Sequence, residues 1–185
     1  MAIRLASLEA IVAEVWQQLC NALHDRQHAW RTPTLATTDG NFADGRTVIL
    51  REVEPAARRL GFFSDERSAK VAQLLSHPMG TLVMWSPALA WQLRCKVQLA
   101  IVDDGLAVSS RWARVKLSPT AQDYLSPLPP GTPLDVDAAP THGAVERTHF
   151  TVVSAQVLCI DWLELHPEGH RRAMFDGDRA AWLQP

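Results

Sequence analysis

The chain has 185 residues, of which 47% are hydrophobic and 21% are charged. This is enough sequence for one globular domain with a substantial core, spanning residues 1–185. The 18 basic and 20 acidic side chains leave a net charge of −2. A nucleic-acid backbone is therefore not expected as the main partner, because proteins that bind one concentrate uncompensated lysine and arginine.

The sequence contains no sign of a membrane, a secretion signal or a metal site. No stretch approaches ~18 consecutive apolar residues, and the first residues lack a basic segment followed by an apolar one. We therefore expect a cytoplasmic location. The three cysteines, Cys20, Cys95 and Cys159, are odd in number and far apart, which argues against both a disulfide framework and a zinc site.

The first half of the chain alternates helical and strand-like segments. Residues 7–26 have apolar side chains at helical spacing behind Ser7, a good N-cap, and predict an amphipathic helix within the amino-terminal region 1–30. Residues 34–38 and 46–53 predict a hairpin with a long turn, and residues 60–64 predict a short strand. A further helix is expected to begin at Ser68 and to stop before His77-Pro78.

The second half of the chain predicts long strands and one irregular region. Strands are expected over residues 81–85, 91–102 and 148–162, and shorter ones over 170–175 and 180–183, with a helix over 105–117. Residues 118–147 hold six of the twelve prolines and predict a long surface loop, with room for a short helix around 121–125.

These elements favour a mainly β fold with flanking helices. About seven strands follow one another with only three helices among them, too few for the crossovers that a parallel sheet needs. A closed or sandwich-like antiparallel barrel decorated by helices is therefore expected.

One pair of segments has the chemistry of a phosphate site. Arg46 begins a predicted strand, and Ser68 and Lys70 stand at the start of a predicted helix. Fixed cations, exposed backbone N–H groups and the helix dipole together favour an anion. In the alternative interpretation, Arg46 and Arg51 are solvated charges on a strand edge and Ser68 is only an N-cap.

Several motifs in consistent order resemble the pyridoxamine 5'-phosphate oxidase-like, FMN-binding split-barrel family, in its short branch rather than the oxidase itself. The motifs are Arg46–Arg51, Phe62–Val71, His77-Pro78, Gln92–Arg94, Asp161–Leu163 and Glu168–Ala173. The resemblance implies a six-stranded antiparallel FMN-binding split barrel. It also implies a homodimer that holds FMN in clefts between the subunits.

The resemblance places flavin contacts on fourteen residues: Arg46, Thr47, Val48, Ile49, Leu50, Arg51, Phe63, Ser64, Ser68, Ala69, Lys70, Gln92, Trp162 and Arg172. Arginine, serine and lysine suit the phosphate dianion, and backbone groups with the Gln92 amide suit the pyrimidine edge of the ring. Arg172 or Arg51 is expected to supply positive charge beside the reduced ring. Two alternatives remain open: Gln92 as an outward polar residue and Trp162 as a core aromatic.

The carboxyl-terminal motif departs from that of the oxidase. Where the oxidase carries arginine two residues before a histidine, this chain has Glu168 before His170, and a carboxylate there repels a substrate phosphate. Arg51 also replaces a lysine, and Ala69 replaces a basic residue. Pyridoxamine phosphate is therefore expected to be a poor substrate, and His170 is the best candidate for an acid or base.

The leading hypothesis is an FMN-dependent oxidoreductase that acts on an unidentified small molecule. The alternative is a non-catalytic flavin- or heme-binding protein of the same fold, and a third possibility is an interaction module whose site has decayed. A lone barrel of this size leaves apolar strands to be covered, with Trp85 and Trp91 expected on that face. A second copy of the chain is the expected cover.

Overall fold

The structure is a computed structural model that describes residues 4–118, 121, 124–134 and 149–185. Residues 122 and 123 of the short helix expected around 121–125, and part of the proline-rich loop, lie outside the described residues. The elements are α1 (Leu8–His24), a 3₁₀ turn η1 (Ala29–Arg31), β1 (Thr34–Thr38), β2 (Ala43–Thr47), β3 (Leu50–Glu54), β4 (Arg59–Asp65), α2 (Ala69–Ser76), β5 (Met79–Ser86), β6 (Trp91–Val102), α3 (Gly105–Val115), β7 (Phe150–Glu164), β8 (Arg171–Asp176) and β9 (Arg179–Leu183).

Helix α1 confirms the amphipathic pattern of the amino-terminal region. The Ser7 hydroxyl accepts a hydrogen bond from the Ala10 N–H at 3.2 Å, so Ser7 caps the helix as expected. Ile11, Val15 and Leu19 are fully buried on one face, which packs against the core of the sheet. In the described part of the chain, no helix has both the length and the hydropathy needed to span a membrane.

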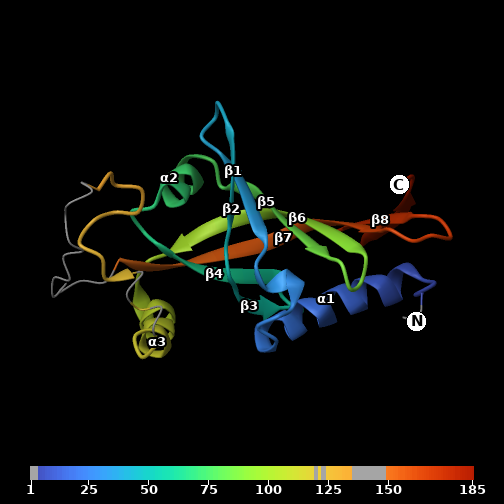
Figure 1. The fold of residues 1–185 in the computed structure, drawn as a ribbon, viewed down its shortest axis with the longest axis horizontal. Coiled ribbons are helices and arrows are strands. Elements are labelled where there is room, and N and C mark those ends of the chain that lie inside the picture. Colours follow the sequence, from blue (N-terminus) through green and yellow to red (C-terminus); the bar gives the residue numbers. More distant parts are fainter. Residues whose placement is uncertain (1–3, 119–120, 122–123, 135–148) are drawn as a thin grey trace.

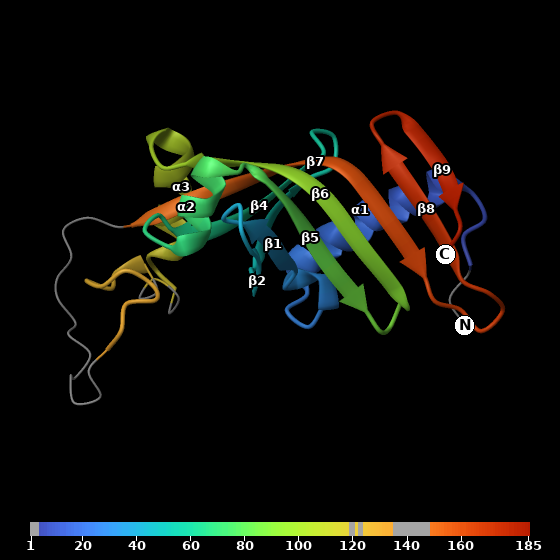
Figure 2. The same ribbon diagram turned by 90° about the horizontal axis from the view of Figure 1, so that it is seen from above.

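All nine strands of the described residues form one antiparallel sheet in the order β2-β1-β5-β6-β7-β4-β3, with β8 and β9 added beside β7. Strand β6 pairs with β7 along almost its whole length. The other edge of β7 is shared, since β4 pairs with residues 150–156 and β8 with residues 159–164. Figure 1 shows α2 on one side of β6 and β7 and shows α1 and α3 on the other, and Figure 2 shows β5 to β9 side by side.

The predicted strand over residues 46–53 is wrong, because the structure divides it into β2 and β3. Strand β2 pairs with β1, whereas β3 pairs with β4 at the far end of the sheet path. The chain must cross between these two positions at Val48 and Ile49, where the Val48 N–H donates to the Pro33 carbonyl at 2.9 Å. This division adds one strand to those expected, and the described residues form nine strands instead of the six that the resemblance implies.

A chain of aromatic rings fills the core beneath α1. Trp91 lies between Trp30 and Trp162, with ring centroids 6.4 and 5.2 Å away, and all three are buried. The expectation that Trp91 lies on an uncovered face is therefore wrong, because Trp91 alternates with Gln92 and points inward. Trp85 is 44% exposed, as expected of a residue on an open face.

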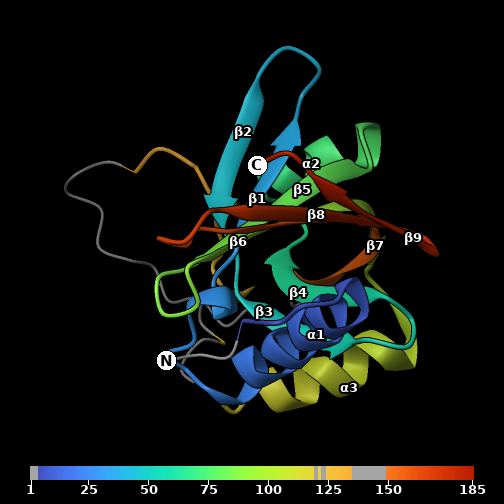
Figure 3. The same ribbon diagram turned by 90° about the vertical axis from the view of Figure 1, so that its right-hand side faces the viewer.

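A buried carboxylate joins the two ends of the chain. Glu164 accepts hydrogen bonds from Arg4 at 2.8 Å and from two nitrogens of Arg171 at 2.8 and 2.9 Å, and Trp91 Nε1 lies 3.4 Å away. The Arg171 guanidinium also stacks over Trp162, 5.6 Å from the ring centroid. Figure 3 shows α1 beneath the strands of the sheet, on the same side as α3.

Replacing Glu164 by glutamine is expected to lower the free energy of unfolding by about 2 kcal/mol, because the partly buried guanidinium groups of Arg4 and Arg171 lose their counter-charge. Burial by itself raises the pKa of Glu164, but the hydrogen bonds from Arg171 and Arg4 outweigh it and hold that pKa below its usual 4.5. The carboxylate therefore stabilises the fold above about pH 4.5, and this contribution is lost as the pH falls through the lowered pKa.

The measurement is urea unfolding of the wild type and Glu164→Gln at several pH values. Glu54→Gln is the matched control, because the Glu54–Arg59 pair is more than 40% exposed on both sides and is expected to contribute less than about 1 kcal/mol. Equal stability of wild type and Glu164→Gln at pH 7 would contradict this account.

Candidate functional site

Lys70, Ser64 and Ser68 form a compact polar cluster where β4 leads into α2. Lys70 Nζ donates to Ser64 Oγ at 3.1 Å and to Ser68 Oγ at 3.2 Å, and the two hydroxyls lie 3.1 Å apart. Both serines are only 3% exposed. The cluster therefore holds a cation and two hydroxyl groups in fixed positions, and it brings together three of the fourteen residues predicted to contact the flavin.

The amino terminus of α2 opens onto this cluster. Ser68 occupies the N-cap position, but its hydroxyl makes no capping bond and is directed to Lys70 and Ser64 instead. The first N–H groups of the helix thus lack the side-chain acceptor that usually satisfies them. An anion placed beside Lys70 would supply that acceptor and meet the positive end of the helix dipole.

The electrostatics of the cluster favour an added anion. Burial lowers the pKa of Lys70, and the nearby positive charge of Arg46 lowers it further. Among the described residues, Lys70 takes part in none of the ion pairs. Two cations that repel each other in a partly desolvated place are stabilised when a phosphate lies between them.

Arg46 on β2 lies close enough to Lys70 for their charges to interact, and it is not a solvated edge charge. Its side chain is 19% exposed, and its Nη2 donates to Gln73 Oε1 on α2 at 3.0 Å and to the Asp44 carboxylate. The Thr37 hydroxyl accepts from Nη1. Gln73, Thr37 and Asp44 were missed by the sequence analysis, because only the folded structure brings α2 against the β1-β2 hairpin.

In residues 47–51, which follow Arg46, Arg51 is the one charged side chain. Val48 and Leu50 are buried, Ile49 is 40% exposed, and Thr47 lies on the surface. The ladder between β3 and β4 shifts between residues 50 and 52, so that Arg51 has no cross-strand partner. This bulge turns Arg51 over the ring of Phe63, with its guanidinium carbon 5.8 Å from the centroid.

Gln92 and Arg172 lie together on another part of the sheet. Leu163 of β7 is the cross-strand neighbour of both, so the three residues form one row on the same face. In the next row, Asp161 accepts from both nitrogens of Arg172 at 2.7 and 3.0 Å and also pairs with Arg94. These three charged groups leave a net positive charge on that face.

The phosphate cluster and the row of Gln92 and Arg172 are far apart within one chain. Ser64 is paired with Thr151, whereas Arg172 is paired with Leu163, twelve residues further along β7. At ~3.3 Å per residue, this path along the strand is about 40 Å. The structure therefore does not bring the predicted flavin contacts together in a single chain, but places them in two groups.

Three other predicted residues are placed as follows. Trp162 is completely buried in the aromatic core, in agreement with the alternative interpretation of this residue, and Ala69 is exposed on the first turn of α2. His170 is exposed in the turn before β8, where its Nδ1 accepts from the His166 N–H at 3.1 Å. A neutral His170 therefore carries its proton on Nε2 and can donate it there.

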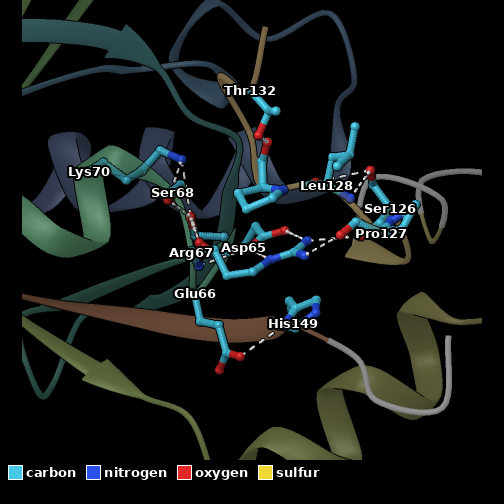
Figure 4. Close-up of polar contacts among 12 residues, drawn as sticks. Asp65, Glu66, Arg67, Ser68, Lys70, Ser126, Pro127, Leu128, Thr132 and His149 are labelled. Carbon is cyan, nitrogen blue, oxygen red and sulfur yellow. Dashed lines mark hydrogen bonds and ion pairs between the residues drawn. The ribbon is translucent and has the colours of Figure 1, made fainter. Parts of the chain in front are cut away.

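Hydrogen bonds from Arg67 hold residues 124–134 of the proline-rich region beside the start of α2 (Figure 4). Asp65 pairs with Arg67 through two hydrogen bonds of 2.7 and 3.0 Å, and Arg67 donates to the carbonyls of Ser126 at 3.0 Å and Pro127 at 3.3 Å. The turn that supplies Ser68 is thereby held from its other side.

A cavity of about 210 Å³ lies between α3 and the β3-β4 hairpin. Its charged groups are already paired, since Arg111 binds Glu52 and Arg59 binds Glu54. Among the described residues, no group of three or more potential ligands is arranged to hold a metal ion.

Comparison with known proteins gives a family match for part of the chain. Residues 13–103 match the model of the pyridoxamine 5'-phosphate oxidase, FMN-binding domain. No curated protein matches the sequence. A pyridoxamine 5'-phosphate oxidase-related, FMN binding protein from Nostoc punctiforme is 21% identical, with a TM-score of 0.74 over 99% of this chain and 100% of its own.

Two further solved structures share the fold. PhzG from Burkholderia lata, in complex with tetrahydrophenazine-1-carboxylic acid, is 15% identical with a TM-score of 0.75 over 100% of both chains. A heme binding protein from Mycobacterium smegmatis is 13% identical with a TM-score of 0.57 over 96% of this chain and 60% of its own. Residues 13–103, which contain Arg46 and the Ser64–Lys70 cluster, match the FMN-binding domain of the pyridoxamine 5'-phosphate oxidase family, and the whole chain has the fold of a solved FMN binding protein related to that oxidase.

Proposed function

We propose that the protein is a homodimeric, FMN-dependent oxidoreductase that acts on a small molecule. The observation that carries this proposal is the pair of cations, Arg46 and Lys70, held beside buried hydroxyls at the uncapped start of α2. These groups match a phosphate monoester, which bears a charge of about −1.5 to −2 at pH 7. When bound, FMN supplies the two-electron chemistry, and the protein supplies binding and electrostatics.

In this proposal the flavin site is shared between two subunits. The phosphate cluster of one subunit binds the phosphate, and Gln92 and Arg172 of the other face the ring. The separation of about 40 Å along β7 supports this division, because a mononucleotide is much too short to touch both groups in one chain. Trp85, 44% exposed, lies beside Gln92 in register and offers apolar surface for a second copy.

The charges on the sheet face that carries Gln92 and Arg172, called the outer face, suit a redox role. Arg94 and Arg172 flank Asp161 and leave one net positive charge, which stabilises an anionic reduced flavin. Glu168 is exposed in the turn before β8, where a carboxylate repels a substrate phosphate. We therefore propose a substrate other than pyridoxamine phosphate, with His170 Nε2 as the available proton donor.

The second candidate function is a non-catalytic flavin or heme carrier. The heme binding protein from Mycobacterium smegmatis shares the fold, which is the basis for keeping this candidate. The Nδ1 of His170 accepts a backbone hydrogen bond, so the neutral ring has a proton on Nε2 and lacks the free lone pair that an iron ligand needs there. This geometry favours the flavin over heme.

Lys70→Met is expected to weaken FMN binding by about tenfold to a hundredfold, because a charge-assisted contact to the phosphate is lost. Riboflavin, which lacks the phosphate, is expected to bind wild type and variant equally. Calorimetric titration of both ligands checks this. Lys96→Met, which removes an exposed lysine from β6, is the matched control. Equal FMN affinity of wild type and Lys70→Met would show that the phosphate does not bind at this cluster.

Co-expression of Lys70→Met and Arg172→Ala tests the shared site. If the site is shared, each mixed dimer keeps one intact site, made of Lys70 from one subunit and Arg172 from the other. About a quarter of all sites are then expected to bind FMN with wild-type affinity, whereas neither variant alone retains any such site. If both groups belonged to one chain, the mixture would bind no better than the separate variants, and the proposal of a shared site would fail.

Stopped-flow reduction separates the enzyme from the carrier. We expect anaerobic NADH or NADPH to bleach the flavin absorbance of the FMN-loaded protein at a rate that saturates with the nucleotide concentration. Apoprotein supplemented with free FMN is the control for non-specific reduction. A carrier would give no saturable phase with either nucleotide, and this outcome would favour the second candidate.

Pyridoxine 5'-phosphate is expected to be a poor substrate. Its oxidation at ~1 to 1000 per second would contradict the proposed exclusion of that substrate.

A further inference from the structure

The guanidinium of Arg46 is engaged by the protein on both of its terminal nitrogens. Nη1 donates to the Thr37 hydroxyl and to the Leu35 carbonyl at 3.4 Å. Nη2 donates to the Asp44 carboxylate and to Gln73 Oε1 at 3.0 Å. These bonds use four of the five N–H groups of the guanidinium, so a phosphate that binds Arg46 through two N–H groups must displace at least one protein acceptor.

Gln73 forms hydrogen bonds with three residues of this arrangement. Its Oε1 accepts from both Arg46 and the Thr37 hydroxyl, the latter at 2.5 Å, and its Nε2 donates to Asp44 Oδ2 at 3.1 Å. One amide from α2 thus fixes groups on β1 and β2. Because Gln73 is neutral and bound through three partners, it can hold the Arg46 guanidinium in place while a charged partner is exchanged.

Asp44 is the partner that can be exchanged. Its side chain is 49% exposed, whereas that of Arg46 is 19% exposed, so the carboxylate can turn into solvent and the guanidinium cannot. The hydrogen bond from Gln73 and the charge of Arg46 keep the pKa of Asp44 below its usual value. Asp44 is consequently a carboxylate at neutral pH and competes directly with an anion for the same guanidinium.

We propose that Asp44 is the resident counter-ion of Arg46, which the flavin phosphate must displace, and that Gln73 is the positioning residue that keeps Arg46 in place during this exchange. The inference rests on the proposed FMN site. It makes Asp44 a specificity determinant, because only a ligand group with more charge than a carboxylate gains from the exchange. A phosphate monoester dianion meets this condition, and the uncharged ribityl end of riboflavin does not.

The two residues are predicted to act in opposite directions. Asp44→Asn removes the competitor, so FMN affinity is expected to rise about tenfold. Gln73→Leu releases the guanidinium, so FMN affinity is expected to fall about tenfold. Riboflavin affinity is expected to change in neither variant, and this readout excludes a general structural effect. Asp178→Asn, which removes an exposed carboxylate from the β8-β9 turn, controls for the change in net charge.

The background variant Arg46→Ala decides whether Asp44 acts through Arg46. In that background Asp44→Asn is expected to leave FMN affinity unchanged, since there is no longer a guanidinium to release. An equal gain with and without Arg46 would overturn the proposal in favour of simple charge repulsion. Unchanged or weaker FMN binding by both Asp44→Asn and Asp44→Ser would also overturn it. Failure of the wild type to bind FMN would instead remove the proposed function itself.

Discussion

Strand β7 is the constraint on which the rest of the structure depends. Its backbone groups must be satisfied on both edges along fifteen residues, and three different strands are needed to do this. Strand β6 lines one edge, while β4 and β8 divide the other. The β4 pairing places Ser64 and the start of α2 at one end, and the β8 pairing places Arg172 at the other. The distance between the two groups of polar residues is thus a consequence of strand length.

The electrostatics of the two groups follow from how each charge is neutralised. On the outer face, Asp161 is shared by Arg94 and Arg172, and these ion pairs are partly solvated. At the start of α2, the hydrogen bonds that Lys70 donates within the described part of the chain go to two hydroxyl groups, and burial lowers its pKa. Desolvating a cation without a counter-charge is costly. The start of α2 therefore has a positive potential, which a bound anion would neutralise.

The structural neighbours show that a shared fold does not determine which molecule a protein binds. PhzG is solved with tetrahydrophenazine-1-carboxylic acid and another neighbour is a heme binding protein, although both share the fold of this chain. A sheet of this kind places loops and strand ends in similar positions whatever they carry, so chemistry depends on the side chains there. In this chain those side chains are Arg46 with its Gln73 and Asp44 partners, and the cluster around Lys70.

The sequence by itself determined the helices, most strands and the family resemblance. Alternation along residues 91–102, the Ser7 cap and the motif from Phe62 to Val71 are local signals that need no partner to be interpreted. Only the tertiary structure decided the break at Val48 and the burial of Trp91. It also decided the position of Gln73 against Arg46. The physical reason is that pairing between distant strands and packing of a helix on a hairpin are set by the whole sheet, and no local pattern encodes them.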